Sequence, residues 1–70
     1  MYDIQDIIRH IDPNVVDTLR RIKNNPKRLQ KWLNEVEDEI RFRLKSKMNY
    51  DKYVFPLKQE RKLILHYLGR

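Results

Sequence analysis

The side chains best suited to binding a charged ligand are basic residues that lie close together in this 70-residue chain. Between residues 20 and 34 there are six basic residues and no acidic one. These six are Arg20, Arg21, Lys23, Lys27, Arg28 and Lys31. A block of positive charge is typical of a surface that binds a polyanion such as the phosphate backbone of nucleic acid. Lysine and arginine also keep helical surfaces soluble, so a solvated face is the alternative interpretation.

A second basic block follows a short acidic segment. Residues 35–39 include four acidic residues, and residues 40–48 include four basic ones. The second block consists of Arg41, Arg43, Lys45 and Lys47. We expect it to help the first block contact the backbone of DNA or RNA, as in an accessory or regulatory protein. Because no motif for reading base edges is present, the expected sequence specificity is weak.

The chain lacks the sets of residues that catalysis requires. It has one glycine, and therefore no glycine-rich phosphate loop, and it has no cysteine. Its single serine, Ser46, has no histidine near it in the sequence. The four carboxylates of residues 35–39 lie at ion-pairing distance from basic residues on the same expected helix, which favours a solvated role. We expect no enzymatic activity and no bound metal or other cofactor.

Helices must position these side chains, and the apolar spacing predicts four of them, near residues 3–11, 13–24, 26–48 and 56–68. Asp12-Pro13 and Asn25-Pro26 each place a capping side chain before a proline, which fits the first position of a helix. Asp3 is a weaker candidate for a cap. The link before residue 26 is short, so the first basic block should surround a corner between two helices. Free N–H groups at residues 27 and 28 could add a phosphate site there.

The 26–48 helix is expected to be the spine of a small all-α bundle. Its apolar residues recur at three- and four-residue steps and are Leu29, Trp32, Leu33, Val36, Ile40 and Leu44. Pairs four residues apart should add ion pairs: Lys31 with Glu35, Glu37 with Arg41, and Glu39 with Arg43. Residues 40–48 also alternate between apolar or small and basic types. A β-hairpin over 40–55, giving a winged-helix-like fold, is therefore the minority alternative.

A helical protein-interaction module, an adaptor or inhibitor, is the second functional hypothesis. It would dock on a larger protein through apolar residues such as Phe42, Leu65 and Tyr67. The run Leu63-Ile64-Leu65 is wider than one helical stripe, so this helix should be buried on more than one side or should self-associate. His10 should be a surface residue, with Asp6 one turn away as a possible partner.

The length and composition of the chain limit its domain number, its means of stabilisation and its location. Residues 1–70 are enough for a single small domain, and without cysteine it cannot be stabilised by disulfides. Self-association is the remaining common means of stabilisation, so we expect a homo-oligomer. No apolar run approaches the length of a membrane span, and no secretory signal pattern is present, so a cytoplasmic location is expected.

Overall fold

The computed structural model describes residues 4–70, which form four α-helices and one short π-helical turn. In chain order the elements are α1 (Ile4–Ile8), α2 (Pro13–Arg21), α3 (Pro26–Lys45), the π-helical turn η1 (Tyr50–Val54) and α4 (Phe55–Tyr67). The described part of the chain contains no strand, so the all-α prediction is confirmed and the β-hairpin alternative is wrong. The cap predicted at Asp3 lies outside the described residues.

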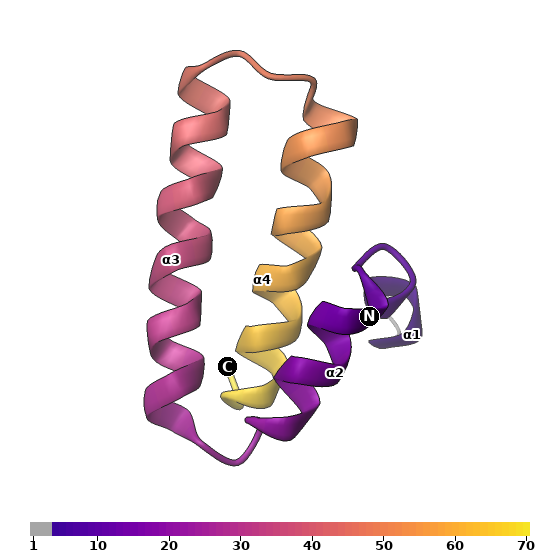
Figure 1. Cartoon of the computed structure of the whole chain (residues 1–70), viewed down its shortest axis with the longest axis vertical. Coiled ribbons are helices and arrows are strands. Elements are labelled where there is room, and N and C mark those ends of the chain that lie inside the picture. Colours follow the sequence, from indigo (N-terminus) through magenta and orange to yellow (C-terminus); the bar gives the residue numbers. More distant parts are fainter. Residues whose placement is uncertain (1–3) are drawn as a thin grey trace.

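Helices α3 and α4 run antiparallel and form a long hairpin with η1 near its turn (Figure 1). The α1–α2 segment packs against α4 on the side away from α3 (Figure 1). Although α3 is the longest helix, α4 is therefore the one that is covered on two sides. This arrangement accounts for the wide apolar run of α4, in which Leu63 and Ile64 have no exposed surface.

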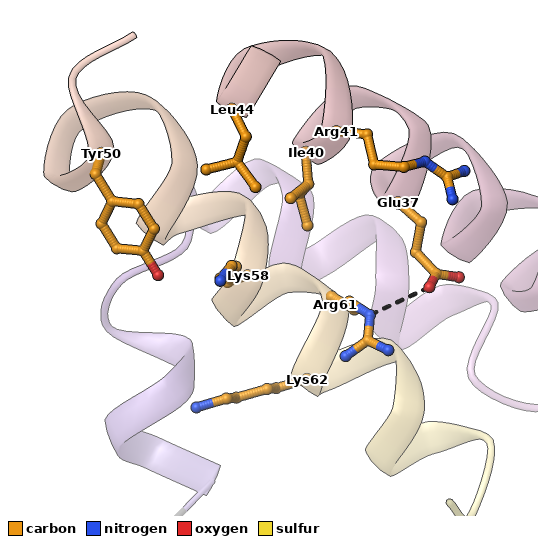
Figure 2. Close-up of a pocket in the computed structure, with 8 residues that line it drawn as sticks. All are labelled: Glu37, Ile40, Arg41, Leu44, Tyr50, Lys58, Arg61 and Lys62. Carbon is orange, nitrogen blue, oxygen red and sulfur yellow. Dashed lines mark hydrogen bonds and ion pairs between the residues drawn. The ribbon is translucent and has the colours of Figure 1, made fainter. Parts of the chain in front are cut away.

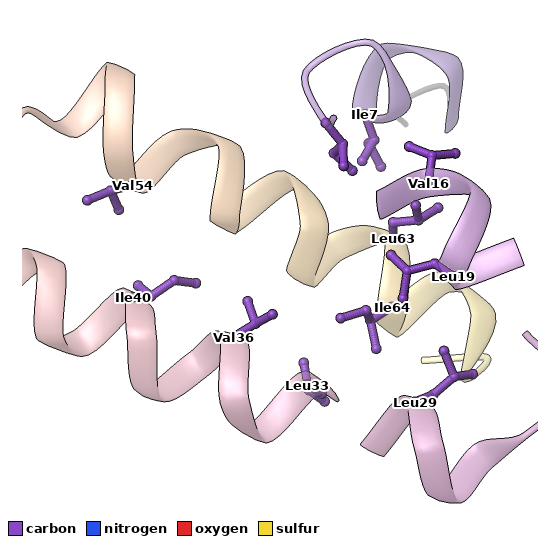
Figure 3. Packing of buried hydrophobic residues seen from close by; sticks show 11 residues of the cluster. Ile7, Val16, Leu19, Leu29, Leu33, Val36, Ile40, Val54, Leu63 and Ile64 are labelled. Carbon is purple, nitrogen blue, oxygen red and sulfur yellow. The ribbon is translucent and has the colours of Figure 1, made fainter. Parts of the chain in front are cut away.

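One hydrophobic core joins all the helices (Figure 3). Its buried members are Ile7, Ile11, Val16, Leu19, Leu29, Leu33, Val36, Ile40, Val54, Leu63 and Ile64. Helical spacing predicted four of them, the residues on α3: Leu29, Leu33, Val36 and Ile40. Burying an aliphatic side chain of this size contributes about 1.5–3 kcal/mol relative to leaving it exposed. The core thus packs α2 and residues 29–40 of α3 against α4.

The two predicted capping devices are both present. The Asp12 carboxylate Oδ1 accepts a hydrogen bond of 2.8 Å from the backbone N–H of Asn14. The Asn25 side-chain Oδ1 accepts one of 3.2 Å from the backbone N–H of Arg28. Proline follows each cap at the first helical position. Local sequence therefore fixes where α2 and α3 begin.

All four helices end earlier than predicted, α4 by a single residue, at Tyr67, and the other three by more. Helix α1 stops at Ile8, and two turn hydrogen bonds then carry the chain to Ile11. Helix α2 stops at Arg21 because the chain must turn before Pro26. Helix α3 stops at Lys45 because Lys47 adopts a left-handed conformation with φ of 55°. The 40–48 segment is therefore helical through Lys45 and irregular after it.

Candidate nucleic-acid interface

The first basic block surrounds the corner between α2 and α3, as predicted. The backbone N–H of Asn25 donates a 2.8 Å hydrogen bond to the carbonyl of Ile22, which closes this turn. All six basic residues are exposed. We call this group the basic corner; it comprises Arg20, Arg21, Lys23, Lys27, Arg28 and Lys31.

No ion pair among the described residues involves the basic corner. The ion pairs of the described chain are Arg9–Asp6, Arg41–Asp38, Arg43–Glu39 and Arg61–Glu37. The predicted pair of Lys31 with Glu35 is not formed, although both lie along the same shallow hollow. The corner therefore presents six positive charges that no carboxylate of residues 4–70 neutralises by direct contact.

The N-terminus of α3 offers less to an anion than the sequence suggested. Pro26 has no N–H, and the N–H of Arg28 is taken by Asn25. Only the N–H of Lys27 in this first turn is left for a ligand. Phosphate binding at the corner would therefore depend on side-chain charge far more than on backbone groups.

The corner cations do not all point the same way. Arg20 lines a hollow that α2 shares with the segment after α1, together with Asp17. Arg28 and Lys31 line a different hollow of about 420 Å³, bordered by Ile22 and Trp32. The positive surface therefore wraps around the corner and does not form one flat patch.

The second basic block lies at the other end of α3. A 20-residue helix is about 30 Å long, so Lys45 and Lys47 are far from the corner. Arg43 is also engaged within the chain: it donates to Glu39 at 2.9 Å and to the backbone carbonyl of Tyr53 at 2.8 Å. The structure thus does not bring the two blocks together at one small site.

An open groove of about 610 Å³ lies along one side of the hairpin, between α3 and the η1–α4 segment (Figure 2). Its lining residues are Glu37, Ile40, Arg41, Leu44, Tyr50, Lys58, Arg61 and Lys62. Four of them are basic and one is acidic, so the groove is positively charged. Ile40, Leu44 and Tyr50 face into it (Figure 2). Of its cations, only Arg41 belongs to the predicted site.

The cations that α4 contributes to this groove were missed, although the sequence holds a signal for them. Lys58, Arg61 and Lys62 are three and four residues apart, which places them on one side of a helix. What the sequence could not show is that this side of α4 faces Arg41. Glu37 reaches across the groove to Arg61 at 3.4 Å, in place of its predicted pairing with Arg41. Arg41 pairs with Asp38.

The opposite side of the hairpin is closed by hydrogen bonds. The Trp32 indole Nε1 donates to the Glu60 carboxylate Oε1 at 2.6 Å, which ties α3 to α4. Burial raises the pKa of the Glu60 carboxyl, while the Trp32 hydrogen bond and the charge of Arg43 oppose that rise. Together with the contact of Arg43 with Tyr53, these bonds leave the groove as the open side.

The predicted protein-interaction residues fall in two environments. Phe42 has 58% of its surface exposed, on the side of α3 away from Ile40. Leu65 and Tyr67 are half-buried and pack against the core. His10 is exposed as expected, but its ring contacts Phe55, and the partner of Asp6 is Arg9.

Within the described residues no cluster of histidine, aspartate or glutamate side chains could hold a metal ion. No helix of residues 4–70 is long and apolar enough to cross a bilayer. Searches of protein-family models, of curated proteins and of solved structures gave no match to this chain. Function must therefore be argued from the surface itself.

Proposed function

We propose that this protein binds nucleic acid by contacting the phosphate backbone through the basic corner. The observation that carries the proposal is that all six corner cations are exposed and none has a carboxylate partner within the described chain. Exposed like charges held close together repel one another, and a bound polyanion relieves that repulsion. The protein cations in turn release counterions that are condensed on the nucleic acid.

The contrast within the chain supports this role. Elsewhere on α3, both arginines, Arg41 and Arg43, pair with carboxylates of their own helix. Lys45 is the one cation of this helix outside the corner that forms no ion pair within the described residues. Positive side chains at the first turn of a helix, as at Lys27 and Arg28, oppose the helix dipole. A local cost of this kind is expected where a residue serves a function other than stability. The wrapped shape of the corner suits a backbone contact that does not depend on base sequence.

The test is binding of fluorescein-labelled DNA and RNA, measured by fluorescence anisotropy at salt concentrations from about 50 to 200 mM. If the six cations each neutralise one phosphate of a duplex, the plot of log affinity against log salt should have a slope of about −5. Replacing Arg21 and Arg28 with glutamine should make that slope shallower by about 1.8. A flat salt dependence would contradict the proposal.

The matched control is Arg9→Gln. This residue is also an exposed arginine, but it pairs with Asp6; it lines the hollow that contains Arg20 and not the one that contains Arg28. The control variant should keep the slope of the unmodified protein. If Arg9→Gln weakens binding as much as a corner substitution does, net charge alone is responsible and the corner is not a defined contact surface.

A protein-interaction module is the second candidate, favoured by the exposure of Phe42 between basic neighbours. An aromatic side chain flanked by Arg41 and Arg43 suits an acidic protein surface with an apolar pocket. The two candidates differ in the residues they need. Nucleic-acid binding requires Arg21 and Arg28, whereas docking of a protein requires Phe42.

A further inference from the structure

We infer that the groove between α3 and α4 binds one unpaired nucleotide of a single-stranded nucleic acid, with its base against Tyr50 and its phosphate among the cations of α4. This inference rests on the proposed function and adds the class of substrate to it. It concerns a surface that is separate from the basic corner.

The groove combines the two features that a nucleotide requires. Tyr50 has 43% of its surface exposed and faces the groove beside the aliphatic side chains of Leu44 and Ile40 (Figure 2). Aromatic side chains of this kind stack on bases. The Lys58 ammonium lies 5.2 Å from the centre of the Tyr50 ring, so a phosphate attached to a stacked base would find a positive charge at hand.

Arg61 can also be recruited by an incoming phosphate. The Arg61 guanidinium pairs with Glu37 at 3.4 Å, and the two side chains keep 42% and 38% of their surfaces exposed. A pair this open contributes only about 0–1 kcal/mol. Separating the Arg61 guanidinium from the Glu37 carboxylate therefore costs little free energy when a phosphate binds the guanidinium instead.

A polar track leads from the groove to the basic corner. Lys27, Asn34 and Arg41 are seven residues apart and share one exposed side of α3. Arg41 lines the groove, and Lys27 belongs to the corner. The distance from one to the other along the helix is about 21 Å. One strand can thus place a base in the groove and its neighbouring phosphates toward the corner.

A single strand fits these observations better than a duplex or a protein. In a duplex the faces of the bases are stacked within the helix, so Tyr50 would have no partner. An acidic protein segment would satisfy the charges, but its carboxylates are not attached to a planar ring, so the segment would need a separate aromatic residue to stack on Tyr50. A nucleotide provides both the planar group and the negative charge.

The experiment compares labelled (dT)12 and (rU)12 with a duplex of the same length, which lies within site sizes of about 4–16 nucleotides. Single strands should bind the full chain more tightly than the duplex does. Tyr50→Leu should weaken single-strand binding by roughly 5- to 100-fold and leave duplex binding unchanged. Tyr50→Phe keeps the ring and should bind as the unmodified protein does.

Tyr53→Leu is the matched control. Tyr53 belongs to the same turn, is 39% exposed and has the Lys52 ammonium 5.4 Å from its ring, but it does not line the groove. The control should retain single-strand affinity. Because both tyrosines are exposed, circular dichroism should show that each variant keeps its fold.

The outcomes separate the two proposals. If Tyr50→Leu leaves single-strand binding unchanged, the groove is not the binding site. The same holds if Tyr53→Leu weakens binding as much as Tyr50→Leu does. Either result contradicts the proposal for the groove and does not affect the proposal for the basic corner. Absence of salt-dependent binding to every probe overturns both. If thymidine monophosphate at the same nucleotide concentration displaces (dT)12, the groove binds free nucleotides. That result would contradict the proposal that its ligand is a single strand.

Discussion

Glu60 shows how a single residue can link a hydrogen bond to the pH dependence of stability. Its carboxylate is half-buried between α3 and α4, where it accepts the Trp32 indole hydrogen bond. Burial raises its pKa above the usual glutamate value. The folded chain therefore holds this proton more tightly than the unfolded chain does. The stabilisation that this bound proton gives the folded state is fully present at pH values below the pKa of Glu60 in the unfolded chain. It is lost as pH rises through the pKa of Glu60 in the folded chain.

Glu60→Gln should remove this dependence. Glutamine keeps an oxygen that can accept the Trp32 hydrogen bond, and it carries no charge to desolvate. We expect the variant to be more stable than the unmodified protein near pH 7. The difference should close as pH falls toward about 4.3, the value for glutamate in an unfolded chain. Thermal unfolding midpoints measured across that range would check this, and a difference that stays constant with pH would contradict it.

Lys47 determines where helix α3 ends. It adopts φ of 55°, and the next residue donates from its N–H to the carbonyl of Arg43 at 3.2 Å. This is the helix-terminating motif in which glycine is the usual residue. Gly69 occupies the equivalent position after α4, with φ of 76°. The motif that terminates α3 therefore contains a lysine, Lys47, in a conformation that is strained by comparison with glycine.

Lys47→Gly should stabilise the protein by about 0.5–1 kcal/mol, because glycine adopts positive φ without the cost that a Cβ imposes. Lys45→Gly is the matched comparison, since Lys45 is also exposed but lies within the helix. That change should destabilise by up to about 1 kcal/mol. Urea unfolding followed by circular dichroism would measure both. Equal effects of the two substitutions would show that the conformation of Lys47 carries no strain.

The elements also show what could be predicted from sequence. Helix starts at Asp12-Pro13 and Asn25-Pro26 depend on neighbouring residues, so local reasoning finds them. The end of α3 at Lys45 could not be found, because the residue that adopts positive φ is a lysine in an alternating run. The contact of Trp32 with Glu60 joins residues 28 apart, and the groove depends on how η1 orients Tyr50. Both arise only when the hairpin closes.

The whole molecule is less compact than its mass requires. Its accessible surface is 5355 Å², whereas about 4,800 Å² is expected for a folded chain of 8.8 kDa. Residues 42–53 form the tip of the hairpin (Figure 1). All the exposed large hydrophobic residues of the described chain lie there: Phe42, Leu44, Met48, Tyr50 and Tyr53. The buried core extends along the hairpin as far as Ile40 and Val54, and the tip beyond them keeps its large apolar side chains exposed.

The same change, leucine to alanine, should have different effects on stability in the core and at the tip. Leu63→Ala removes a side chain with no exposed surface at the centre of the core and should cost about 2–5 kcal/mol. A domain of this size has a total stability of only about 4–10 kcal/mol, so the variant should be largely unfolded or close to it. Leu44→Ala removes a side chain that is 48% exposed at the tip and should cost less than about 1 kcal/mol.

Urea unfolding of both variants would provide the comparison, with single-strand binding as a second readout for Leu44→Ala. If Leu44 serves the groove and not the core, its loss should weaken binding of (dT)12 while stability is nearly unchanged. A large loss of stability at Leu44 would instead mean that the tip is part of the core. The exposed side chains of the tip would then stabilise the fold and would not form a ligand-binding surface.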